Sequence, residues 1–213
     1  TLIHTLDKMV SPRVVVVGLG VQADFSLETA RSAIAECCRY LRRIGVESIA
    51  TVAHGAGIGA LDASEVGQAM VTGAILGLYR FDKYKAEDGE RRCVKQFTIV
   101  ESDAGKVESL EQGVSEGAVV AEAVNFCRDM ANEPANFMTP SLMAERALQV
   151  AGECGLSIEV LNLPQIEELG MGAFLGVARG SQESPKFIIL RYVGDPDDEA
   201  NSLGLLGKGI TFD

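Results

Sequence analysis

Strand and helix patterns follow one another in a regular order over the first hundred residues. Val14 to Val17 is a β-branched run that ends at Gly18-Leu19-Gly20, which is typical of a buried parallel strand entering a loop. Helical and strand patterns then alternate in four segments: a helix from Leu27 to about Leu41, a strand at 48–52, a helix at 66–78 and a strand at 94–100. This alternation predicts a doubly wound α/β sheet.

Capping signals stand at the ends of these helical patterns. Ser26 precedes apolar residues spaced three and four apart, and Gly45 ends that pattern. Asp62 stands three residues before Glu65, which is the spacing of a capping box, ahead of the second helix. The signals support helices between the predicted strands.

A different pattern follows from about residue 106 to residue 130, where one long helix is predicted. Asn132-Glu133-Pro134 breaks it, because proline cannot continue the helical backbone ladder. Thr139-Pro140, an N-cap followed by proline at the first helical position, then opens a second unit. We interpret the chain as an N-terminal α/β domain at 1–105, a linking helix at 106–133 and a second α/β domain at 134–213.

The second unit has its own helix and strand patterns. A helix runs from Pro140 to about Glu153 and closes at Gly155, and a short helix is predicted at 164–169. Three segments have strand patterns, at 157–161, 186–193 and 203–206. We expect this unit to be incomplete, because its last strand patterns have no helix after them.

Composition excludes several classes of function. Thirty acidic and nineteen basic residues give a net charge of −11, which disfavours nucleic acid and anionic lipid as partners. No apolar run approaches the ~18 residues of a membrane span. The five cysteines include no Cys-x-x-Cys pair, so we predict buried, reduced thiols and a cytoplasmic protein.

Two glycine-rich segments could bind phosphate groups. Gly18-Leu19-Gly20 has part of a dinucleotide-binding pattern, but Ala23 stands at the place of the third glycine. Backbone N–H groups at 55–59 could cradle a phosphate, although the segment lacks the Gly-Lys-Ser/Thr ending of a nucleotide loop. A tight turn and a surface loop, respectively, are the favoured interpretations.

The segment from Gly207 to Asp213 could instead bind a metal. Lys208 lies between two glycines after an apolar strand pattern, and Asp213 follows five residues later. A straight strand would separate their α-carbons by up to ~17 Å, so the two side chains can share a site only if the glycines let the backbone bend. Spacing alone favours a solvated lysine and a separate aspartate.

Several motifs, in this order, resemble the leucyl aminopeptidase (cytosol aminopeptidase) family. The upstream motif is Gly73-Ala74-Ile75-Leu76-Gly77-Leu78-Tyr79-Arg80-Phe81-Asp82-Lys83-Tyr84-Lys85. The others are Asn132-Glu133-Pro134-Ala135-Asn136, Thr139-Pro140, Leu169-Gly170-Met171-Gly172-Ala173-Phe174-Leu175-Gly176-Val177 and Gly207-Lys208-Gly209-Ile210-Thr211-Phe212-Asp213. The resemblance covers nearly the whole chain, and it favours Lys208 and Asp213 as site residues.

The resemblance implies a macro-like N-terminal α/β domain, a linking helix and the start of a C-terminal catalytic α/β domain. It implies a cytoplasmic, hexameric metalloexopeptidase that releases N-terminal amino acids from peptides, with a leucine-type preference and two divalent ions, Mn or Zn, per subunit. Lys208 would bind one metal through a neutral amine, and Asp213 would bind at the metal pair. The resemblance assigns no catalytic side chain and no substrate-binding residue within this chain.

Family members continue past this aspartate into Ser-Gly-Gly, a catalytic lysine and further ligands, and their N-terminal domains begin with additional strands. We therefore expect a truncated chain that holds two of five metal ligands and is inactive by itself. The alternative is a macro-like module that binds a nucleotide such as ADP-ribose, or mediates assembly, without catalysis. Its support is the Gly18-Leu19-Gly20 turn and the loop from His54 to Gly59.

Overall fold

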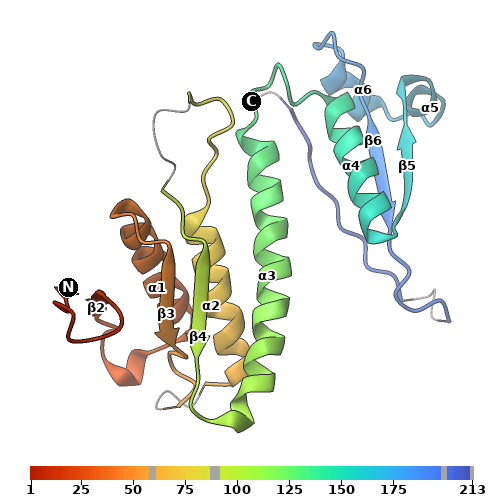
Figure 1. Ribbon diagram of the computed structural model, residues 1–213. Coiled ribbons are helices and arrows are strands. Elements are labelled where there is room, and N and C mark those ends of the chain that lie inside the picture. The colour runs from red at the N-terminus through yellow and green to blue at the C-terminus, as the bar shows by residue number, and fades with distance from the viewer. Residues whose placement is uncertain (58–60, 87–91, 198–200, 212–213) are drawn as a thin grey trace. The chain divides into compact units, whose positions relative to one another are not determined.

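The computed structural model describes residues 1–57, 61–86, 92–197 and 201–211. It has a mixed α/β architecture with two compact units, Thr1–Asp129 and Met130–Asp213. Figure 1 shows the helices and strands of both units. Among the described residues, no helix is both long and apolar enough to cross a membrane.

The first unit is built around a parallel strand pair with helices packed against it. In chain order its elements are β1 (Leu2–His4), β2 (Arg13–Val15), the 3-10 helix η1 (Gln22–Asp24), α1 (Leu27–Arg43), β3 (Ser48–Val52), α2 (Ala63–Leu78), β4 (Gln96–Val100) and α3 (Ala104–Asn132). β3 and β4 are parallel, with Ser48 opposite Gln96 and Val52 opposite Val100. Figure 1 shows α1 and α2 next to this pair and α3 alongside α2.

The helix ends in this unit confirm Ser26 and Asp62 as N-caps. The Thr29 N–H donates to Ser26 Oγ at 3.3 Å, and the Ser64 N–H donates to Asp62 Oδ1 at 2.9 Å. Gly45 has a φ of +77°, the left-handed conformation that glycine adopts without steric cost after a helix. The buried core joins α1, α2, β3 and α3 through side chains that include Ile34, Cys38, Ile49, Val66, Met70 and Leu110.

Glycines let α2 approach its two neighbouring helices closely. A Cβ added at Gly113 of α3 would lie 1.9 Å from the Ser64 carbonyl oxygen of α2, and one at Gly67 would lie 2.6 Å from the Leu110 oxygen. On the other side, a Cβ at Gly73 would lie 2.3 Å from the Arg31 oxygen of α1. The contacts between α2 and α3 join residues 64–71 of α2 to residues 110–117 of α3, all within the first unit.

The segment Val14 to Val17 does not form the buried parallel strand that its sequence predicted. Residues 13–15 pair in an antiparallel hairpin with β1, and Val16 and Val17 are 55% and 40% exposed. The prediction of a buried parallel strand is therefore wrong. The turn passes through Leu6 and Asp7, both at positive φ, and the Thr5 hydroxyl donates to the Ser11 oxygen at 2.7 Å. Backbone hydrogen bonds to the neighbouring strand β1 satisfy β2. A β-branched pattern predicts a strand but does not show which strand will be its partner.

The second unit is a helix packed on an antiparallel strand pair, with two short helices. Its elements are α4 (Pro140–Cys154), β5 (Ser157–Leu161), α5 (Leu163–Glu168), α6 (Gly172–Ala178) and β6 (Phe187–Arg191). β5 and β6 pair with Ser157 opposite Arg191. The predicted N-cap is confirmed, because the Leu142 N–H donates to Thr139 Oγ1 at 3.3 Å, and Gly155 ends α4 with a φ of +67°.

The strand predicted at 203–206 is not present in the structure. Residues 202–210 have no regular secondary structure, and Leu203, Leu205 and Leu206 are 86%, 88% and 96% exposed. A strand requires a partner for its backbone, and among the described residues β6 pairs only with β5. An apolar run predicts a strand by its composition, but pairing decides whether the strand forms.

The cysteines are less buried than predicted. Cys38 is buried and Cys37 half-buried, whereas Cys93, Cys127 and Cys154 are exposed. All five are free thiols. Burial raises the pKa of Cys38 to about 12, so this thiol is a core residue and not a nucleophile.

Candidate metal-ligand segment

Lys208 lies in an exposed segment with irregular backbone, between Gly207 and Gly209. Its side chain is accessible to an ion from solution. Asp213, the other predicted ligand, lies outside the described residues, so the meeting of Lys208 and Asp213 at one site stays a prediction.

The backbone beside Lys208 rests on α4. A Cβ added at Gly209 would lie 3.2 Å from Met143 Sδ and 3.9 Å from the Met143 methyl carbon. The first distance is shorter than an ordinary van der Waals contact, so Gly209 fits against Met143 because it has no side chain. A Cβ at Gly207, two residues earlier, would meet nothing within 4 Å.

The described residues supply one donor and not a complete metal site. Among them, no group of three or more His, Cys, Asp or Glu side chains is placed to hold a metal. An amine donor is chemically suited to Zn or Mn when neutral. Lys208 therefore fits one ligand position of such an ion, and the remaining donors must come from outside the described residues.

The loop after β3 packs inward over its described part. His54 Nε2 lies 2.9 Å from Thr51 Oγ1, and the His54 N–H donates to Met70 Sδ at 3.4 Å. Burial lowers the pKa of His54 below its usual range. A Cβ at Gly55, which has a φ of +100°, would lie 2.6 Å from the Phe25 ring. These are the contacts of a packed loop; residues 58–60 lie outside the described part, so a phosphate cradle at 55–59 stays a prediction.

The turn at Gly18-Leu19-Gly20 does not lead directly into a helix. Gly20 has a φ of +83°, which fits the tight-turn interpretation. The first helix after it, η1, spans Gln22–Asp24, and α1 begins beyond its N-cap Ser26. A dinucleotide loop places the pyrophosphate at the N-terminus of the helix that follows it at once, so the local geometry favours a turn.

A cavity of about 760 Å³ runs beside β4, and no sequence pattern predicted it. Its walls come from β4, α2 and α3 and are mostly apolar, with Lys95, Glu101 and Glu111 as their charged members. The side chains that line it include Val71, Ala74, Ile75, Phe97, Ile99, Leu110 and Val114. Its mostly apolar lining offers packing surface.

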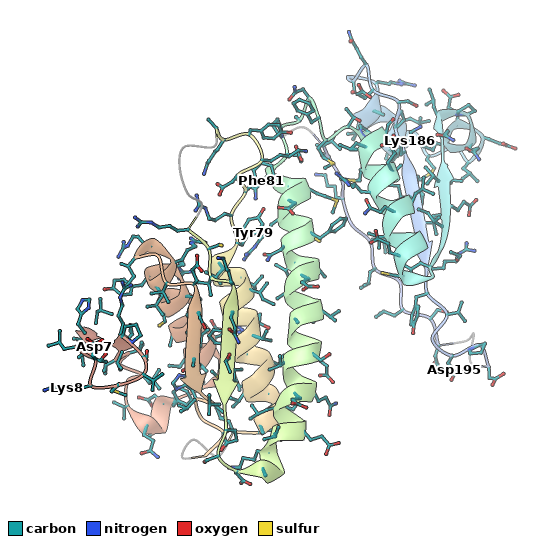
Figure 2. All side chains as sticks on the ribbon, viewed as in Figure 1. Asp7, Lys8, Tyr79, Phe81, Lys186 and Asp195 are labelled. Atoms are coloured by element: carbon teal, nitrogen blue, oxygen red, sulfur yellow. The ribbon has the colours of Figure 1, made fainter. Side chains whose placement is uncertain are left out.

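The motif at 73–85 forms the end of α2 and the residues after it. Arg42 of α1 donates to the Leu78 oxygen at 2.7 Å, and Arg128 of α3 donates to the Leu76 oxygen at 3.3 Å. The Tyr79 hydroxyl donates to Asp129 Oδ1 at 2.8 Å; Figure 2 shows Tyr79 where α2 ends. The two arginines satisfy carbonyls that a helix C-terminus leaves without intrahelical partners, and their charge complements the helix dipole.

Comparisons with known proteins agree with the motifs. Residues 1–88 match the N-terminal domain of the cytosol aminopeptidase family, and residues 125–213 match the catalytic domain of the same family. A probable cytosol aminopeptidase of Alkaliphilus metalliredigens is 38% identical over 214 residues, which cover 100% of this chain and 42% of the relative. The chain thus spans under half the length of the curated relatives that it matches.

Solved structures show the same fold. The bottromycin maturation enzyme BotP in complex with Mn is similar with a TM-score of 0.70 and 31% identity, over 85% of this chain and 36% of that one. A mutant of tomato leucine aminopeptidase is similar with a TM-score of 0.71 and 24% identity, over 84% and 35%. The second likeness supports the fold alone.

Proposed function

The chain belongs to the cytosol aminopeptidase family, and on this premise we propose that it forms part of a metal-dependent aminopeptidase. The reaction is the release of N-terminal amino acids from peptides, with a leucine-type preference. The observation that carries the proposal is the catalytic-domain match over residues 125–213, because it includes the segment with Lys208.

Lys208 and Asp213 are the proposed metal ligands of this chain. The full site holds two divalent ions, Mn or Zn, and the similarity to an enzyme solved with Mn supports that choice. Such a metal pair activates water and polarises the scissile carbonyl. Lys208 would contribute its amine from an exposed segment, and Asp213 would contribute a carboxylate.

The organisation of the molecule is part of the same proposal. We assign a macro-like domain to 1–105, a linking helix to 106–133 and the beginning of the catalytic domain to 134–213. Peptides are the substrates, a homohexamer is the assembled form and the cytoplasm is the compartment. The family membership supports these assignments.

A chimera tests the activity at the length of a family member. This chain replaces the segment that it matches in the Alkaliphilus metalliredigens relative, and hydrolysis of leucine p-nitroanilide is measured with Mn²⁺. We expect activity in the chimera and its loss, by at least about a hundredfold, in the Lys208→Ala variant. Lys186→Ala is the matched control, because the Lys186 amine already donates to Asn162 Oδ1 at 2.6 Å. A folded chimera that hydrolyses no peptide bond or anilide would refute the proposal.

The chain by itself is expected to release no p-nitroaniline under the same conditions. Among its described residues, no group of three or more His, Cys, Asp or Glu side chains could hold a metal ion. Turnover by this chain alone, unaffected by a chelator, would show that the metal site is not the one proposed.

A further inference from the structure

We propose that Met143 is a positioning residue for Lys208. The side chain of Met143 supports the backbone at Gly209 and thereby sets where the Lys208 amine can reach. The inference rests on the proposed role of Lys208 as a metal ligand, and it adds a residue that is not itself a ligand.

The structure places Gly209 against the side chain of Met143 in α4. A Cβ at Gly209 would lie 3.2 Å from Met143 Sδ, whereas a Cβ at Gly207 would meet nothing within 4 Å. Lys208 is exposed, and residues 202–210 have no regular structure. The contact at Gly209 therefore lies directly next to the proposed ligand, in a segment that is itself neither helix nor strand.

Met143 is itself held in place by the start of α4. Its N–H donates to the Thr139 oxygen at 3.0 Å, and Thr139 Oγ1 accepts from the Leu142 N–H at 3.3 Å. Met143 thus lies in the capped first turn of the helix, where the backbone is fixed. The neighbouring Ala144 is buried, so this turn is anchored in the second unit.

Fixing Gly209 restricts Lys208 because consecutive α-carbons are about 3.8 Å apart. A metal ligand has to be held within about 0.5 Å of its productive position, and a movement of the backbone at Gly209 displaces the point from which the Lys208 side chain reaches. The unbranched thioether of Met143 can follow the flat backbone of a glycine closely. Loss of this contact should loosen the ligand without removing it.

Methyl NMR tests the contact without any metal. The chain has six methionines, so labelling with [¹³C-methyl]methionine gives six probes. We expect Gly209→Ala to shift the Met143 methyl resonance more than the other five, and Gly207→Ala, the matched control, to leave it unchanged. Gly209→Ala should also lower the melting temperature less when Met143→Ala is present, because the smaller side chain makes room for the added methyl.

Manganese tests the positioning. Mn²⁺ added to the full chain should broaden the Met143 resonance, and the Lys208→Ala variant should lose this broadening. Free Mn²⁺ measured by EPR should show about tenfold weaker binding in Met143→Ala, with binding retained in Met143→Leu and in the control Met171→Ala. If Lys208→Ala binds Mn²⁺ as the wild type does, the ligand role fails. If Lys208→Ala loses binding while Met143→Ala retains it in full, the positioning role of Met143 fails.

Discussion

At the scale of single residues, the close approach of α3 to α2 depends on Gly113. A Cβ at this position would lie 1.9 Å from the Ser64 carbonyl oxygen, which is backbone and cannot rotate away. We predict that Gly113→Ala destabilises the protein by about 1–3 kcal/mol, because the helices must move apart. Denaturant unfolding followed by circular dichroism measures the change.

Gly152 of α4 provides the matched control for this prediction. It is exposed, and a Cβ there would meet nothing within 4 Å. Gly152→Ala should therefore stabilise the protein by about 0.5–1 kcal/mol through the helix propensity of alanine. Equal effects of the two substitutions would show that the α2–α3 contact is not as close as described.

His54 should make stability depend on pH in a known direction. Burial lowers its pKa in the folded state, so the unfolded state, with a pKa of about 6.5, takes up a proton first as the pH falls. The contribution of His54 is thus fully present above pH 6.5 and is lost as the pH falls from there towards the lowered folded pKa.

The measurement is the melting temperature between pH 7.5 and pH 5.5. The wild type should lose more than His54→Gln over this interval, and only the slopes are compared, since Gln can change the baseline. Parallel slopes for the two proteins would contradict the prediction.

At the scale of elements, the sequence predicted what depends on local chemistry. Ser26 and Thr139 each accept a hydrogen bond from a backbone N–H three residues later, and Gly45 and Gly155 end helices at positive φ, as their sequence context indicates. The strand predictions made from the apolar runs at 14–17 and 203–206 were wrong, since a strand depends on a partner that its own residues do not specify. The short helix α6 was missed because its glycines weaken the helical pattern.

The cap of α4 gives a prediction at this scale. Thr139→Ala removes the oxygen that accepts from the Leu142 N–H and should cost about 1 kcal/mol. Thr139→Ser keeps an oxygen at the same place and should remain within a few tenths of a kcal/mol of the wild type. Chemical unfolding of the two variants measures the difference, and an equal loss in both would assign the effect to the threonine methyl group.

At the scale of the whole molecule, the candidate site could be predicted only from the resemblance. The spacing of Lys208 and Asp213 by itself favoured two unrelated surface side chains, because five residues of extended chain hold them far apart. Five motifs in a fixed order selected the metal-ligand role instead. The contact between Met143 and Gly209 had no signal in the sequence, since the two residues are distant in the chain and meet only in the fold.

The two compact units give the last prediction. Each of the units Thr1–Asp129 and Met130–Asp213 has its own helices and strand pairs, so a single two-state transition is not expected for the chain. Differential scanning calorimetry should resolve two transitions. Gly113→Ala, in the first unit, should lower one transition temperature and leave the other unchanged, whereas Thr139→Ala, in the second unit, should do the reverse. If each substitution shifts both transitions equally, the chain unfolds as one cooperative body and the two-unit description of its stability is wrong.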